Sequence, residues 1–148
     1  MAKQLYIRLQ EPTVELVIVS KPDAANQTSS VVVGFKRYAV DQIKDKFDSF
    51  EQAGKDGEET AVTFLSNEII YIKKAQLDIY EDDVFVETIT VEDTRTATPV
   101  VDFWETPKEC LIVLSGYFLN STPWKSPLTD AFIKAVLNTD YKEAELKN

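Results

Sequence analysis

Hydrophobic positions alternate with polar ones along the first forty residues, a pattern typical of half-buried strands. Apolar side chains take every second position in residues 5–9, and β-branched runs follow at 14–19 and 31–38. Pro12 stops the first run, because proline cannot donate to a strand ladder. Gly34, inside the third run, indicates a bulge or a close backbone approach. We therefore expect three strands in this part of the chain.

From Val40 the apolar period changes to three and four residues, which is typical of helices. Residues 40–53 predict an amphipathic helix that ends at Gly54. Residues 60–67 suit a short helix that gives way to a long strand. Two further helices are predicted over 107–120 and 127–138, because in each case a capping hydroxyl precedes a proline at the first helical position. At the first of them, the Glu109 carboxylate is expected to accept from the backbone amide of the capping Thr106.

Residues 78–93 predict a hairpin, since apolar positions alternate on both sides of the polar turn 81–83. Strands and helices are thus segregated along the chain, which favours an α+β fold with an antiparallel sheet. We expect one domain over residues 1–138, with about five strands, one amphipathic helix and a C-terminal helical pair. The polar tail 139–148 is expected to fray.

Composition narrows the chemistry of the chain. It has 25 acidic and 16 basic residues, a net charge of −9, no histidine and one cysteine. Histidine-dependent catalysis, an intramolecular disulfide and a structural zinc cage are therefore excluded. Cys110 lies on an apolar helical stripe and is expected to be a buried core residue, not a nucleophile. The four glycines never form a phosphate-binding motif. We expect no catalytic residues, no cofactor and no metal.

Composition also limits location and partners. An acidic chain is a poor ligand for phosphates, so direct nucleic-acid binding is not expected. No apolar run approaches the roughly 20 residues that span a bilayer, so no membrane association is expected. The single thiol and the lack of a signal-like start predict a reducing bacterial cytoplasm. Self-association is left open.

The negative charge is concentrated in the predicted hairpin, where residues 78–93 sum to −7 without one base. Its acids are Asp78, Glu81, Asp82, Asp83, Glu87, Glu92 and Asp93. Three interpretations compete. The charges can solvate a strand edge and discourage aggregation, they can form a docking face for a basic protein, or they can bind a divalent metal. The third is weakest, because the spacing and the missing glycine do not fit a calcium loop.

Aromatic residues gather around the two C-terminal helices. Trp104 stands before the first helix, Tyr117 lies on it, and Trp124 lies in the connection to the second. Core packing accounts for most such residues. A helical pair with aromatic corners can also form a groove for an amphipathic partner segment, so these three are candidate partner-binding residues.

Three stretches of the C-terminal half resemble a known family. They are Glu92-Asp93-Thr94-Arg95-Thr96-Ala97, Phe103-Trp104-Glu105-Thr106-Pro107-Lys108-Glu109-Cys110-Leu111 and Thr122-Pro123-Trp124-Lys125-Ser126-Pro127-Leu128. Together with Gly34-Phe35-Lys36-Arg37-Tyr38 they resemble small bacteriophage tail-gene proteins regarded as tail assembly chaperones, over residues 34–138. The resemblance implies a non-enzymatic cytoplasmic protein that binds the tape-measure protein and helps tail subunits polymerise. It transfers no functional residue.

The leading hypothesis is accordingly a phage protein-binding module of the tail assembly chaperone type. An alternative is an acidic phage inhibitor that mimics nucleic acid and binds a basic host protein through the hairpin. A metal-dependent carboxylate hydrolase is the third and least favoured hypothesis.

Overall fold

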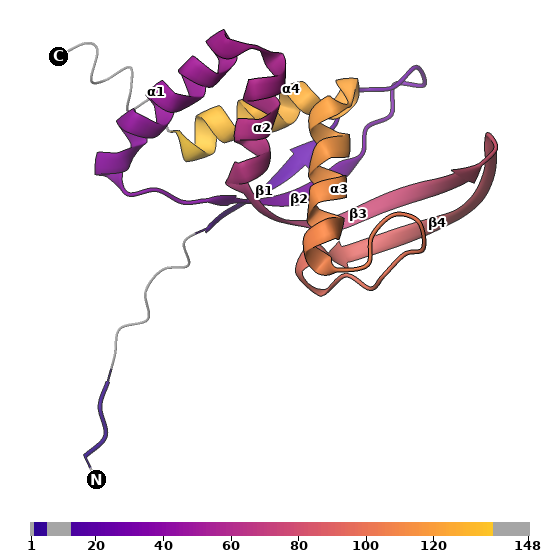
Figure 1. Cartoon of the computed structure of the whole chain (residues 1–148), viewed down its shortest axis with the longest axis horizontal. Coiled ribbons are helices and arrows are strands. Elements are labelled where there is room, and N and C mark those ends of the chain that lie inside the picture. The colour runs from indigo at the N-terminus through magenta and orange to yellow at the C-terminus, as the bar shows by residue number, and fades with distance from the viewer. Residues whose placement is uncertain (1, 6–12, 138–148) are drawn as a thin grey trace.

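The computed structural model describes residues 2–5 and 13–137. Its elements form an antiparallel sheet with helices packed against it (Figure 1). The strand order is β1-β2-β3-β4, with every neighbouring pair antiparallel. The strands are β1 (Thr13–Val19), β2 (Ser30–Lys36), β3 (Ile69–Glu81) and β4 (Val84–Asp93). The predicted α+β class is confirmed. The prediction of about five strands is wrong for the described residues, which form four, and all of the run predicted at 5–9 except Leu5 lies outside them.

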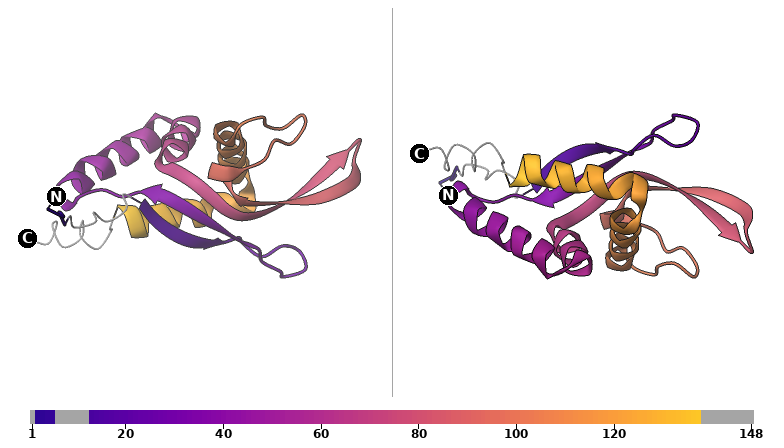
Figure 2. Two further views of the ribbon diagram at one scale, coloured as in Figure 1. Left: turned by 90° about the horizontal axis from the view of Figure 1, so that it is seen from below. Right: turned by 90° about the horizontal axis from the view of Figure 1, so that it is seen from above.

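The helices gather on one face of the sheet. Seen from below, β1 and β2 lie in front of α4, and seen from above α4 lies in front of them (Figure 2). The helices are α1 (Val40–Asp56), α2 (Glu58–Glu68), α3 (Pro107–Asn120) and α4 (Thr122–Ala131), with a 3-10 turn η1 (Thr94–Thr96) and a π-helical turn η2 (Phe132–Val136). The predicted helices at 40–53, 60–67 and 107–120 are confirmed.

The main core lies between β2, β3 and the helices. Val31, Val33 and Phe35 of β2 are fully buried, and the Phe35 ring lies 5.7 Å from that of Phe132. Phe50 of α1 meets the same Phe132 ring edge-on at 5.4 Å. A central strand that is covered on both faces has apolar residues at consecutive positions, which explains the apolar run of β2.

The second face of the sheet is covered by side chains instead of helices. A Cβ atom on Gly34 would lie 2.3 Å from the ring of Tyr71, so only glycine fits beneath that ring. The Tyr71 hydroxyl donates to Glu15 at 2.5 Å, and the Arg95 guanidinium stacks 3.9 Å from the ring centroid. The β2–β3 register also shifts between Gly34 and Phe35. The register shift at Gly34 fits the predicted bulge, and the group that approaches Gly34 closely is the side-chain ring of Tyr71 and not another backbone.

The start predicted for the last helix at Pro127 is wrong. The helix begins at Thr122 with Pro123 in its first turn, and Pro127 lies inside it. Proline has no N–H to donate four residues back, so the Pro123 carbonyl needs another donor. The backbone N–H of Lys21 supplies it at 2.9 Å and ties α4 to the segment after β1.

The predicted cap of α3 is confirmed with one change of partner. The Thr106 hydroxyl accepts from the Glu109 amide at 3.2 Å. The Glu109 carboxylate accepts from the amide of Glu105 at 3.1 Å, one residue before the expected cap amide. The helix N-terminus is still closed by a reciprocal pair of hydrogen bonds.

Candidate functional site

The distal part of the β3–β4 hairpin leaves the sheet as a two-stranded ribbon. Pairing between β2 and β3 ends at Val32 and Lys73, whereas β3 stays paired with β4 as far as Glu81 and Val84. Lys74, at the point of departure, has a φ of 59°, a left-handed conformation that re-aims the strand. We call residues 75–91 the ribbon; it extends beyond the helices at the right of Figure 1.

The ribbon ends in a two-residue turn at Asp82 and Asp83. Their φ angles are 51° and 63°, as the hairpin turn that matches strand twist requires. Just behind the turn, the exposed rings of Tyr80 and Phe85 meet edge-on at 5.8 Å. The hairpin predicted from the sequence is therefore confirmed, including its polar turn.

The seven acids of the hairpin have different environments. Asp93 caps η1 and holds Arg95 at 2.7 Å, and the hydrogen bond from Arg95 lowers its carboxyl pKa. Asp78 accepts from the Thr88 hydroxyl at 2.7 Å across the two strands. The other five acids are exposed, and no cation among the described residues lies within ion-pair distance of them: Glu81, Asp82, Asp83, Glu87 and Glu92. These five are the carboxylates available to a partner.

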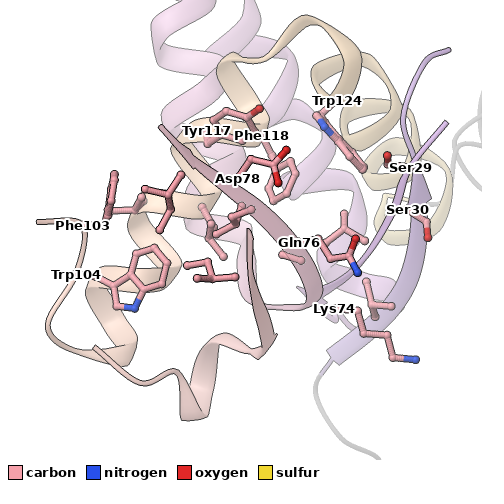
Figure 3. Close-up of a pocket in the computed structure, with 18 of the residues that line it drawn as sticks. Ser29, Ser30, Lys74, Gln76, Asp78, Phe103, Trp104, Tyr117, Phe118 and Trp124 are labelled. Carbon is pink, nitrogen blue, oxygen red and sulfur yellow. The ribbon is translucent and has the colours of Figure 1, made fainter. Parts of the chain in front are cut away.

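A groove of about 1070 Å³ lies between the ribbon and α3 (Figure 3). The ribbon wall includes Leu77, Ile79 and Ile89, and the α3 wall includes Val113 and Tyr117. The remaining lining residues are Thr28, Ser29, Ser30, Val31, Val32, Lys74, Ala75, Gln76, Asp78, Tyr80, Phe103, Trp104, Leu114, Phe118 and Trp124. The groove continues the apolar core into a region that the helices leave open.

The structure brings the three predicted aromatic residues to this one groove. Trp104 is almost fully buried and its indole N–H donates to the Thr98 carbonyl at 2.9 Å, so it shapes the floor. Tyr117 is 58% exposed, and Trp124 packs edge-on against Phe118 at 4.9 Å. Of the three, Tyr117 presents the most surface to a partner.

The aliphatic walls of the groove are not among the residues that the sequence predicts to bind a partner. In the sequence, Leu77, Ile79 and Ile89 predict only the strands of a hairpin. Their alternation with polar neighbours indicated a buried face, but nothing local indicated that α3 would stand opposite and leave a gap. Phe103 and Val113, which complete the site, carry no local signal either. Of the acids predicted to bind a partner, Asp78 alone lines the groove.

Other reactive groups have structural partners or are buried. Cys110 is fully buried, as predicted, and burial raises the pKa of its thiol to about 11. Glu68 in the core accepts from the Tyr38 hydroxyl at 2.5 Å and pairs with Lys46 at 2.9 Å. Across the described residues, His, Cys, Asp and Glu side chains form no cluster of three that could hold a metal ion.

Comparison with protein families, curated proteins and solved structures finds no match for this chain. Each helix in the part of the chain that the structure describes is too short or too polar to cross a membrane.

Proposed function

We propose that the protein is a non-enzymatic binding module that holds an apolar segment of another protein in the groove between the ribbon and α3. The groove itself is the observation that supports this proposal. Its walls join the half-buried Leu77 and Ile79 to the exposed Phe103 and Tyr117. Exposed apolar surface that lies together in a groove is typical of interaction sites.

Charge favours a basic partner over a second copy of this chain. The ribbon beside the groove carries an excess of carboxylates, so two ribbons brought together would repel each other. A segment with lysine or arginine next to its apolar residues would instead be attracted to this rim. Such complementarity raises the association rate and selects the partner.

A phage tail assembly chaperone is the particular module that we propose. The resemblance of residues 34–138 to that class supports it, and the client would be the tape-measure protein. Co-expression with a tape-measure protein tests it: the two should co-purify, and the client should become more soluble. A client that neither co-purifies nor gains solubility would contradict this assignment.

Two neighbouring positions on α3 make the test specific to the groove. Val113 lines it and is 38% exposed, whereas Ile112 lies outside its lining and is 59% exposed. V113E should abolish co-purification, and I112E should leave it intact. Equal loss in both variants would place the contact elsewhere on α3.

The five available carboxylates support a second candidate, an acidic inhibitor that mimics nucleic acid. Four of them, Glu81, Asp82, Asp83 and Glu87, lie on the ribbon, which extends beyond the helices (Figure 1). Charge reversal at Asp82, Asp83 and Glu87 should then abolish binding to a basic host protein, and the complex should weaken steeply with salt. A client held by apolar contacts would show a much smaller salt effect.

A further inference from the structure

We propose that the open edge of β3 beside the groove binds its partner by strand addition, so that an extended partner segment becomes a new strand next to residues 75–80. This inference rests on the proposed docking function and specifies the form of the ligand. The ligand is then a segment of the partner protein in extended conformation, with apolar and basic residues in alternation.

The sheet has a vacant strand position at this place. Among the described residues, β3 pairs with β2 only as far as Lys73, and from Ala75 onwards it pairs with β4 alone. One edge of β3 is therefore open where β2 and β3 diverge. A strand with one unpaired edge offers its N–H and C=O groups to any extended segment that can reach them.

The groove meets β3 along this edge. Its lining includes all seven consecutive residues 74–80, although successive side chains of a strand point to opposite faces. A groove that touched one face of the strand would be lined by alternate residues. Figure 3 shows Lys74, Gln76 and Asp78 along the strand, with Ser29 and Ser30 of the diverging segment on the other side of the gap.

The two faces of β3 determine the pattern of the added strand. Leu77 and Ile79 are half-buried, while Asp78 and Tyr80 are exposed. An added strand would therefore place every second side chain into the apolar groove, toward Val113 and Tyr117. Its other side chains would lie beside Asp78, where a lysine or arginine forms a favourable cross-strand pair.

Charge along the edge orients the segment. Lys74 stands at the inner end of the open edge, Asp78 at its middle, and the acidic turn at its outer end. The basic residues of the partner are therefore expected toward the tip of the ribbon.

Two synthetic peptides made of the same number of lysine and leucine residues test the mode of binding. In one the residues alternate, and in the other they follow a helical period. We expect the alternating peptide to bind the full chain at least tenfold more tightly by titration calorimetry. Equal or tighter binding of the helical peptide would overturn strand addition but leave groove docking standing, whereas no binding by either peptide would overturn both.

Backbone methylation tests the edge directly. Methyl groups on every second amide of the alternating peptide block one of its edges, and the complementary set blocks the other. We expect one set to weaken binding at least tenfold and the other to leave it nearly unchanged. Equal affinity of both methylated peptides and the parent would contradict pairing with β3.

Charge variants separate the open edge from general attraction to an acidic protein. D78K and E92K change the net charge equally at exposed positions, but Asp78 alone lines the groove. D78K should weaken the alternating peptide several-fold more than E92K, with the two far-UV circular dichroism spectra unchanged. Equal weakening would show that the peptide responds to net charge and would overturn the assigned edge.

Discussion

Replacement of Gly34 by alanine is the most direct test of how the second face of the sheet, which is covered by side chains instead of helices, is built. The new methyl carbon would lie 2.3 Å from two atoms of the Tyr71 ring, well inside contact distance. Because the ring is held by Glu15 through its hydroxyl and by the stacked Arg95, it cannot move aside without losing both contacts.

Overpacking of this kind costs typically about 1–3 kcal/mol. Alanine recovers some of that cost, about 0.4–1 kcal/mol, by restricting the unfolded chain. Since the displaced ring also loses its two partners, we expect a net loss near 2 kcal/mol. For a domain of this size that corresponds to a drop in Tm of roughly 4–8 °C.

Urea unfolding of four proteins measures the effect: the parent, G34A, Y71A and the double variant. In the Y71A background the same alanine should stabilise the fold by about 0.4–1 kcal/mol, which gives a coupling energy of about 2.4–3 kcal/mol. G116A is the matched control, because nothing lies within 4 Å of its new methyl group and helix propensity predicts a gain of about 1 kcal/mol. Additive effects of G34A and Y71A would refute the proposed contact.

Three further predictions concern single side chains. D83G should relieve the left-handed strain at the turn by about 0.5–1 kcal/mol and slow amide exchange in the ribbon; unchanged exchange would contradict this. S115A should stabilise the fold by about 1 kcal/mol in urea, because the buried Ser115 hydroxyl lacks a hydrogen-bond partner in the described part of the chain; a loss of stability would show that it has one. Arg95 lowers the pKa of Asp93, so the stabilisation that the ionised Asp93 carboxylate contributes should be fully present above the usual pKa of 3.8 and be lost as the pH falls through the lowered value. In urea unfolding at a series of pH values, D93N should flatten this loss of stability toward low pH. An unchanged loss of stability would refute the assignment.

Local patterns along the chain predicted most elements of the fold. The three-residue period of α1, the hydroxyl-proline start of α3 and the alternation around the acidic turn all have short-range causes, and each element formed where its pattern lies. Pro127 is not a helix start, because a proline marks a helix start only when no earlier start competes. Here Thr122-Pro123 begins the helix, and the Lys21 amide compensates for the proline inside it, a contact between residues 102 positions apart.

The candidate site was predictable only in fragments for the same reason. Sequence patterns identified Trp104, Tyr117, Trp124 and Asp78, but each in a separate local context. Their convergence depends on where β2 leaves β3 and on how α3 crosses the sheet, which is tertiary information. Asp93 forms an ion pair with Arg95, a local contact that a count of charges alone cannot detect.

Amide hydrogen exchange, measured with and without the alternating lysine-leucine peptide, shows where the partner segment docks. We expect the peptide to slow exchange along the open edge, in residues 75–80, and to leave the outer edge of β4 unchanged. Protection confined to β4, or to β1 around the exposed Val17 and Val19, would contradict a docking site between the ribbon and α3.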